Sequence, residues 1–428
     1  MARIMKDSGI EWMPVVPHNW EILRNKQLFY EVNERCENGE SHTLLSVSEY
    51  YGIAPKSDKI KAGDFETRAE SLDGYKLCKR DDIVMNIMLA WKKSVGKSDY
   101  NGIVSPAYCV YRKKRSLEPK YYHYLFRLDV CADLFKRYST GIIDSRLRLY
   151  PDKFLSLKMT VPPVDEQKKI SDYLDRKCAD IDSAIEKTRE SIEEYKKLKH
   201  AVITNAVTKG IRGKRPMKES GIEWIGMIPD NWDVVRIKNL FDYRNEKNYK
   251  PLEEVNLISL YTDKGVVQHS DLEATTGNKA SNADGYKHVY EDDIVVNIIL
   301  CWMGAIGRSA YTGVTSPAYD VYAPKENTNS KFYHHYFRTS GFNGDCYKVG
   351  RGIMAMRWRT YADQFRAIKV VAPPENEQEE IVKYLDKKCA EIDILISKKE
   401  QYLTELESYK KSLIYEYVTG KKEVPWDN

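Results

Sequence analysis

The chain of 428 residues has no cysteine pair with the spacing of a disulfide framework or a zinc site, because its eight cysteines stand singly. It has no run of 18 apolar residues that could cross a bilayer. The longest apolar stretch, Ile294 to Met303, contains Asn297 and predicts a buried strand. No apolar signal segment follows Met1. These absences predict a protein of the reducing cytoplasm, with no membrane contact and no bound metal.

Motifs for nucleotide binding and methyl transfer are missing as well. The run Gly96 to Ser98 resembles the end of a phosphate-binding loop, but Trp91 stands where the first glycine of that loop is required. Two proline pairs, Pro162–Pro163 and Pro373–Pro374, lack the polar and aromatic neighbours of the turn with which an amino-methyltransferase grips a flipped base. They instead indicate rigid starts for the segments that follow.

Acidic and histidine pairs offer little further chemistry. Asp81–Asp82 and Asp292–Asp293 could bind a nuclease metal, but each leads directly into an apolar stretch, which favours a turn before a strand. The pair His334–His335 has no cysteine or acidic ligand at a zinc spacing and indicates an ordinary strand or helix position. No Ser/His/Asp or Cys/His set recurs in both halves of the chain. We therefore expect no catalysis by this chain itself.

A long internal repeat is the strongest signal present. Ser8 to Trp12 returns as Ser220 to Trp224, an offset of 212 residues, and past one deletion Asp81 to Val84 returns as Asp292 to Val295, an offset of 211. The same offset relates several further pairs: Asn86 and Asn297, Trp91 and Trp302, Ser105 to Tyr108 and Ser316 to Tyr319, Arg146 and Arg357, Arg148 and Arg359, and the two proline pairs. The chain is therefore one module followed by a second copy.

Between these matches the copies differ sharply. Residues 31–74 and 243–285 share almost nothing, and 139–145 and 350–356 share little beyond one glycine. A duplicated module needs its frame in both places, so the stretches that differ are those whose task differs between the copies.

Periodicity predicts the elements of each copy. Residues 83–95 and 103–112 are rich in β-branched and aromatic residues and predict strands, whereas 121–137 predicts an amphipathic helix. After each proline pair, apolar residues recur at alternating steps of three and four over about four heptads, which is typical of a coiled coil. The predicted seam consists of nine positions in each copy: Leu174, Cys178, Ile181, Ile185, Thr188, Ile192, Tyr195, Leu198 and Val202 in the first, and Leu385, Cys389, Ile392, Ile396, Lys399, Leu403, Leu406, Tyr409 and Leu413 in the second.

The predicted fold class is therefore α+β, with two mixed α/β modules in tandem, each followed by a long helix. The expected boundaries are 1–163 for the first module, 164–210 for the central helix, 211–374 for the second module and 375–428 for the C-terminal helix. Two helices with the same pattern in one chain are expected to pair with each other. We favour an antiparallel pair, because a parallel one would crowd both modules at one end.

The distribution of charge suits a polyanionic partner. The net charge is only +5, but residues 1–163 hold 27 basic and 21 acidic residues, whereas 375–428 hold 9 and 13. Basic and aromatic residues also alternate in the predicted loops, as in proteins that contact phosphates and base edges. Any single one of these is more often a solvated surface residue. The candidate DNA-binding residues are Tyr50, Tyr51, Lys92, Lys93, Lys97, Arg146 and Arg148 in the first module, and Tyr261, Lys264, Trp302, Arg308, Arg357 and Arg359 in the second.

The arrangement resembles the specificity subunit of type I restriction–modification systems over essentially the whole chain. The resemblance rests on motifs that come in tandem order. They are Ser-Gly-Ile-Glu-Trp followed by Pro-x-x-Trp (Pro17 to Trp20, Pro229 to Trp232), Pro-Pro-x-x-Glu-Gln (Pro162 to Gln167, Pro373 to Gln378), Ile-x-x-Tyr-Leu-Asp at each helix start, and a Val-Thr-x-Gly close that is one residue shorter in the second copy.

This resemblance implies that each module is a target-recognition domain for one half of a bipartite sequence in double-stranded DNA. It implies that the helices set the gap between the halves and dock two modification subunits, which methylate adenine, while restriction subunits translocate and cleave DNA. S-adenosylmethionine, ATP and Mg²⁺ would then bind those partners, and this chain would hold no cofactor.

Two alternatives compete with this interpretation. One is a stand-alone two-domain DNA-binding or architectural protein, and the other is an enzyme with unrecognised nuclease chemistry. A helix surface that keeps exposed aromatic residues after the helices pair would count against the first alternative, because that surface needs a partner. Cleavage of DNA by the purified chain with Mg²⁺ would favour the second.

Overall fold

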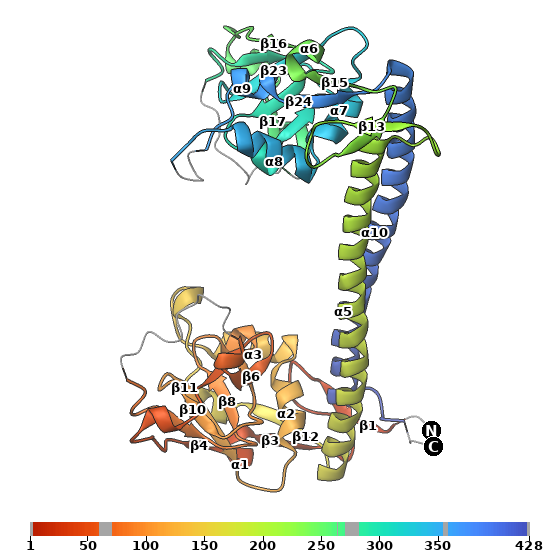
Figure 1. Cartoon of the computed structure of the whole chain (residues 1–428). Helices are drawn as coiled ribbons and strands as arrows, with labels where there is room; N and C mark the ends of the chain where they lie inside the picture. Colours follow the sequence, from red (N-terminus) through yellow and green to blue (C-terminus); the bar gives the residue numbers. More distant parts are fainter. Residues whose placement is uncertain (1–2, 60–70, 263, 270–281, 354–357, 426–428) are drawn as a thin grey trace. The chain divides into compact units, whose positions relative to one another are not determined.

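The computed structural model describes residues 3–59, 71–262, 264–269, 282–353 and 358–425 (Figure 1). It divides into two compact units. The first unit comprises Met1–Arg189 with Gln401–Asn428, and the second comprises Glu190–Glu400. Each unit therefore contains one module together with one half of each long helix.

The first module is built from short strands and helices. In chain order its elements are β1 (Met5–Asp7), β2 (Val15–Pro17), β3 (Glu21–Arg24), α1 (Asn25–Leu28), β4 (Phe29–Val32), η1 (Gly39–Ser41), β5 (Leu45–Ser48), β6 (Gly52–Pro55), η2 (Ser57–Lys59), β7 (Lys76–Cys78), β8 (Ile83–Asn86), η3 (Ala90–Lys92), β9 (Val95–Lys97), β10 (Gly102–Val104), β11 (Tyr108–Lys113), α2 (Pro119–Phe126), α3 (Asp129–Tyr138), η4 (Asp144–Arg146), α4 (Pro151–Ser156) and β12 (Lys158–Val161). The central helix α5 (Val164–Lys209) follows.

The second module repeats this order almost element for element. Its elements are β13 (Met217–Glu219), β14 (Met227–Pro229), β15 (Asp233–Arg236), α6 (Ile237–Leu240), β16 (Phe241–Arg244), η5 (Leu252–Glu254), β17 (Ile258–Tyr261), β18 (Gly265–Gln268), β19 (Lys287–Val289), β20 (Ile294–Asn297), η7 (Cys301–Met303), β21 (Ile306–Arg308), β22 (Gly313–Thr315), β23 (Tyr319–Pro324), α7 (Ser330–Phe337), α8 (Ser340–Val349), α9 (Ala362–Ala367) and β24 (Lys369–Ala372). The C-terminal helix α10 (Glu375–Val418) follows.

An antiparallel four-stranded sheet lies at the centre of each module. Its strand order is β4-β11-β8-β9 in the first and β16-β23-β20-β21 in the second, so the two sheets have the same topology. Two-stranded ribbons, among them β5-β6 and β17-β18, complete each module. The predicted α+β class and tandem repeat are therefore confirmed.

Four sequence-based element boundaries are wrong. The predicted strand 103–112 is two strands, β10 and β11, with residues 105–107 between them. The predicted helix 121–137 is two helices, because Leu128 adopts an extended backbone and buries its side chain between them. The predicted strand 83–95 ends at Asn86 and resumes only at β9. The apolar stretch from Ile294 likewise ends as a strand at Asn297, where the side-chain oxygen accepts hydrogen bonds from the Ile299 and Leu300 amides. Each side chain that breaks an element makes a contact that the local pattern does not contain.

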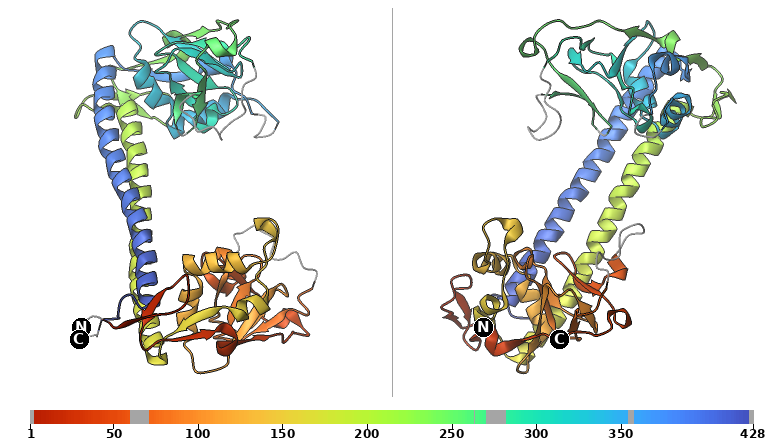
Figure 2. Two further views of the ribbon diagram at one scale, coloured as in Figure 1. Left: turned by 180° about the vertical axis from the view of Figure 1, so that it is seen from behind. Right: turned by 90° about the vertical axis from the view of Figure 1, so that its left-hand side faces the viewer.

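Within each unit the two long helices run side by side in opposite directions (Figures 1 and 2). In the first unit the Tyr173 and Tyr417 rings are 4.6 Å apart and Asp182 pairs with Lys410 at 2.6 Å. In the second unit the Lys199 and Asp393 side chains pair at 2.6 Å, and Arg212 pairs with Glu380 at 2.8 Å. As the residue number increases along α5, the residue number of its partner on α10 decreases. The predicted antiparallel pair is therefore confirmed.

The helix pair belongs to the core of each unit. In the first unit Leu174 of α5 and Leu413 of α10 lie in one apolar cluster with Trp20 of the module. In the second unit Leu385 of α10 lies in the corresponding cluster with Trp232. Both tryptophans are fully buried. Because apolar burial is the main stabilising term, each module is held to its helices by its own core.

The aspartate pairs stand at turns before strands, as predicted. The second aspartate of each pair is almost wholly buried and meets an arginine. Arg112 of β11 donates from Nε and Nη2 to Asp82, at 2.9 Å each. In the second module Arg244 of β16 donates to Asp293, at 2.9 and 3.3 Å, while Ala323 occupies the position of Arg112. The two copies thus neutralise the same carboxylate from different strands, which is a structural role.

Candidate nucleic-acid interface

Three loops of the first module carry most of its candidate DNA-binding residues. The first is the turn between β5 and β6 with Tyr50, the second is the turn of η3 with Lys92, and the third is the loop of 139–148 that contains Arg146. These loops come from distant parts of the sequence. Two side chains of the α2–α3 region hold them together.

Arg127, the residue that ends α2, joins the first two loops. Its Nη1 donates hydrogen bonds to the carbonyl oxygens of Ser48, Lys93 and Val95 at 3.1, 2.8 and 3.2 Å. Its Nη2 donates to those of Glu49 and Tyr50 at 2.7 and 3.2 Å. The planar guanidinium suits this role because it presents five donors in a fixed fork. We call this arrangement the arginine clamp of the first module.

The third loop is attached through α3. The Lys136 ammonium lies 4.9 Å from the centroid of the Trp91 ring in η3 and pairs with Asp144 of the loop at 2.9 Å. Lys93 of the η3 turn pairs with Asp129 at the start of α3. The three loops are therefore one connected surface.

The second module repeats the clamp with Arg338, the residue that ends α7. Its Nη1 donates to the carbonyl oxygen of Ile306 at 3.1 Å, and its Nη2 donates to that of Thr262 at 2.9 Å. Those carbonyls belong to the β21 strand and the β17–β18 turn, the counterparts of β9 and the β5–β6 turn. Arg127 and Arg338 were not among the predicted site residues, although both sit at the repeat offset of 211, a signal that could have found them.

The attachment of the third loop differs between the copies. Tyr347 stands at the position of Lys136, and its ring lies 5.6 Å from Trp302 of η7 and stacks on Trp358 of the loop at 4.8 Å. An aromatic stack therefore does in the second module what a cation–π contact and an ion pair do in the first. The frame is shared while the loop chemistry has diverged.

The structure leaves several predicted residues open to a partner. Tyr50 is 84% exposed, and Lys92, Arg146 and Lys264 are exposed on their turns. Tyr51 beside Tyr50 is also exposed, at 37%. The other candidates are partly buried on these loops or on their counterparts in the second module: Lys93, Arg148, Tyr261, Trp302 and Arg359. Arg357 lies outside the described residues.

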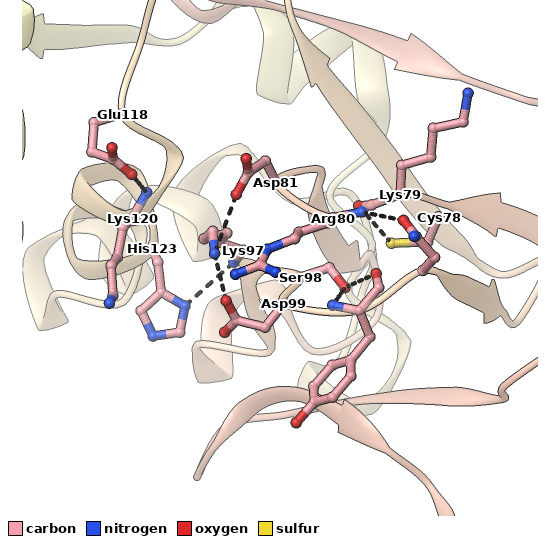
Figure 3. A network of polar contacts seen from close by, with 12 residues as sticks. Cys78, Lys79, Arg80, Asp81, Lys97, Ser98, Asp99, Glu118, Lys120 and His123 are labelled. Carbon is pink, nitrogen blue, oxygen red and sulfur yellow. Dashed lines mark hydrogen bonds and ion pairs between the residues drawn. The ribbon is translucent and has the colours of Figure 1, made fainter.

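Lys97 and Arg308 do not fit their predicted role (Figure 3). The Lys97 side chain is only 9% exposed and pairs with Asp81 at 3.2 Å and Asp99 at 2.5 Å. Burial works against its charge, but the hydrogen bonds and charges of Asp99 and Asp81 raise the pKa of the Lys97 ammonium. Arg308, its counterpart, is 15% exposed and pairs with Asp292. Both cations are already neutralised inside their modules, so we withdraw them as DNA contacts.

A histidine lies under each of these cations. The Lys97 backbone N–H donates to Nδ1 of His123 at 3.3 Å (Figure 3), and the Arg308 N–H donates to Nδ1 of His334 at 3.1 Å. Burial lowers the pKa of both imidazoles to about 3, so both rings are neutral and can accept these bonds. His335 beside His334 has a pKa lowered to about 4, also by burial. The histidine pair is thus a packing feature of α7.

A basic hollow of about 480 Å³ adjoins the β17–β18 turn in the second unit. Its lining includes Lys196, Lys199 and His200 from α5 together with Lys264 and Arg338 from the module. Asp393 is the acidic residue in this lining. The excess of cations favours a polyanion on this side of the unit.

Two further searches concern the described residues alone. Within them, no group of three or more His, Cys, Asp or Glu side chains is arranged to hold a metal ion. Among the helices in the described ranges, none combines the length and the apolar character needed to cross a membrane.

Comparisons with known proteins agree with this geometry. The family model described as the type I restriction modification DNA specificity domain matches residues 229–405. A Methanocaldococcus jannaschii protein described as the specificity subunit of the type I restriction enzyme MjaX is 26% identical, over 92% of this chain and 96% of its own length. The MjaVIII specificity subunit of the same organism is 27% identical, over 55% of this chain and 52% of its own length.

Two solved structures share the fold. A chain from a structure of the complex assembly and conformational transition of the type I R-M system aligns over 95% of this chain and 99% of that one, with a TM-score of 0.70 at 13% identity. The HsdS subunit from Thermoanaerobacter tengcongensis aligns over 95% of this chain and 98% of that subunit, with a TM-score of 0.54 at 14% identity. These matches show that the chain has the fold of the type I restriction–modification specificity subunits, and the family model for that DNA specificity domain matches its second module and part of α10.

Proposed function

We propose that each module reads one half of a bipartite, asymmetric sequence in double-stranded DNA. The observation that carries the proposal is the duplicated arginine clamp, which holds loops of different sequence on the same frame. A shared scaffold with divergent loops suits two modules that recognise two different short DNA sequences. Contacts to bases determine which sequence is bound, whereas the scaffold positions the loops on the DNA. The exposed residues Tyr50, Lys92, Arg146 and Lys264 are the first candidates for DNA contact.

We further propose that the paired helices dock two modification subunits and, through them, restriction subunits. Among the aromatic residues of the two long helices, Tyr173 and Tyr417 pack against each other. Tyr402 and Tyr409, however, stay 49% and 56% exposed in the first unit, and Leu198 stays 48% exposed in the second. Exposed large apolar and aromatic side chains of this kind mark protein interfaces. They favour a multisubunit role over a stand-alone DNA-binding protein.

In this proposal the chemistry resides on the partners. Modification subunits would bind S-adenosylmethionine and methylate adenine, and restriction subunits would use ATP and Mg²⁺. Asp82 and Asp293, just before β8 and β20, each form an ion pair with an arginine. This pairing favours a structural role for the two carboxylates over metal-dependent cleavage of DNA.

Exchange of one module tests the reading of half-sites. Replacing residues 1–163 by the same module of another family member is expected to change one half of the methylated motif and leave the other half and the gap unchanged. Methylation sequencing of host DNA, with the native gene, the exchanged gene and a deletion strain, measures this directly. If deletion left every methylation motif in place, or if the exchange altered both halves, the proposal would be wrong.

Helix length tests the origin of the gap. The 46 residues of α5 run without interruption from the first unit into the second. Four residues inserted after Arg189 and four after Glu400 add ~6 Å of helix, which corresponds to about two base pairs of DNA. The expected motif keeps both halves with a longer unspecified gap. Insertion into α5 alone is the control, because it breaks the pairing register, and altered half-sites in the double insertion would refute the role of the helices.

A further inference from the structure

A segment whose ends are joined by two backbone hydrogen bonds, with an exposed apolar residue near its start, occurs at the same place in both modules. In the first, the Thr140 and Arg148 backbones exchange two hydrogen bonds, of 2.8 and 2.9 Å. In the second, Arg351 and Arg359 do the same, at 2.8 and 2.9 Å. The two ends of each loop are therefore joined by a backbone hydrogen-bonded pair.

The residue after the glycine is an isoleucine in both loops. Ile142 is 98% exposed and Ile353 is 94% exposed, and the two are related by the repeat offset of 211. This match lies inside a stretch that otherwise diverges and was overlooked in the comparison of the copies. The residue before Ile142 must be glycine for the loop to keep this backbone, because a Cβ at Gly141 would lie 2.5 Å from the Arg146 carbonyl oxygen.

Neither isoleucine serves the core of its own module. A side chain this exposed contributes nothing to packing, and a single exposed apolar residue would need no explanation. Two at equivalent positions, each in a segment whose sequence diverges elsewhere, indicate a use that both modules share. Arg146, exposed four residues after Ile142, places a cation on the same loop.

We propose that Ile142 and Ile353 are the apolar base contacts of the two modules. The inference rests on the proposed function. Each isoleucine reaches into a groove of the half-site while the neighbouring cations bind phosphates. Two modes share this chemistry: packing on the methyl group of a thymine, and partial insertion between adjacent base pairs. Both remove the isoleucine from water, and both give sequence preference at one or two positions.

The test uses the complete modification complex, assembled with its partner subunits. Ile142→Ser is expected to weaken binding to duplex DNA carrying the full motif by about 10-fold, within the range of one good base contact, and to leave binding to non-specific DNA unchanged. Methylation sequencing should show relaxed preference at one or two positions of one half-site. Ile353→Ser should do the same to the other half-site only. Ile4→Ser is the matched control, since Ile4 is 75% exposed but lies on a different part of the first unit.

Modified DNA separates the two modes. Uracil in place of each thymine removes the methyl group and should reproduce the loss in the wild-type complex if that group is the contact. If insertion is the mode, 2-aminopurine beside the contacted step should gain fluorescence with the wild type but not with Ile142→Ser. Unchanged affinity and motif in both serine variants would overturn the inference alone. A wild-type complex that methylates no bipartite motif would overturn the proposed function and this inference with it.

Discussion

Lowering the pH from 7 to 5 is expected to cost the second unit about 4 kcal/mol of stability through its two buried histidines, and the first unit about 2 kcal/mol through one. The first unit contains His123, whose pKa burial lowers to about 3. The second contains His334 and His335, with pKa values lowered by burial to about 3 and about 4. An unfolded histidine titrates near 6.5, so each of these side chains takes up a proton more readily in the unfolded chain.

The direction follows from proton uptake. At pH 7 these histidines are neutral in both states and make no difference to stability. Below pH 6.5 these imidazoles bind protons in the unfolded state but stay neutral in the folded state. The free energy of unfolding therefore falls progressively as the pH falls toward 3 or 4. At pH 5 the loss is roughly 2 kcal/mol for each histidine. The second unit holds one such histidine more than the first.

One substitution isolates the difference between the units. Tyr124 occupies the position of His335 in the first module and donates a hydrogen bond to Asp175 at 2.8 Å. Asp386, the counterpart of Asp175, lies 4.0 Å from His335 Nε2. His335→Tyr should therefore place a similar bond in the second unit and remove about 2 kcal/mol of its acid sensitivity. Hydrogen exchange of peptides from each unit at pH 7 and pH 5 measures both effects. Equal acid sensitivity of the two units in the wild type would contradict the prediction.

Removing the clamp is expected to have an effect of similar size. Arg127→Ala leaves the carbonyl groups of the Ser48–Tyr50 turn and of Lys93 without their donor. Unpaired carbonyl groups in a partly buried site cost about 1–3 kcal/mol each, less where water reaches them, so the first unit should lose about 3 kcal/mol. The two loops should also exchange amide hydrogens faster. In the modification complex, one half-site should lose its sequence preference.

The duplicated chain supplies the controls for this variant. Arg338→Ala should produce the same loss in the second unit and affect the other half-site. Arg127→Lys keeps the charge, but its single ammonium cannot reach all the carbonyls that the guanidinium fork serves, and a partial effect is expected. If Arg127→Ala disturbed both half-sites equally, the clamp would not be a device of one module.

The two long helices and the repeated topology of the modules were predictable because they depend on local and periodic patterns in the sequence. The heptad spacing from Leu174 and from Leu385 predicted both long helices and their pairing, since an apolar stripe must be covered by another. The repeat offset predicted two modules of one topology, because matching residues must fill matching cores. Trp20 and Trp232, buried at equivalent places, are the clearest example.

The candidate interface was only partly predictable. Tyr50 and Arg146 are exposed on connected loops, as expected of reading residues, whereas Lys97 lies in an ion-pair network with Asp81 and Asp99. A lysine has the same appearance in a sequence whether a carboxylate lies beside it or not. The repeat offset relates Arg127 to Arg338, but the role of the clamp did not show in the sequence because its partners are backbone carbonyls.

The amino-acid sequence by itself thus determined the duplication, the helices and the resemblance to a family, because each depends on order and spacing along the chain. Only the tertiary structure decided which cations are neutralised, which loops meet at Arg127 and Arg338, and that Ile142 and Ile353 stand in solvent. Those properties depend on neighbours that folding brings from far along the chain, and the energy of a charge or an apolar group is set by its neighbours.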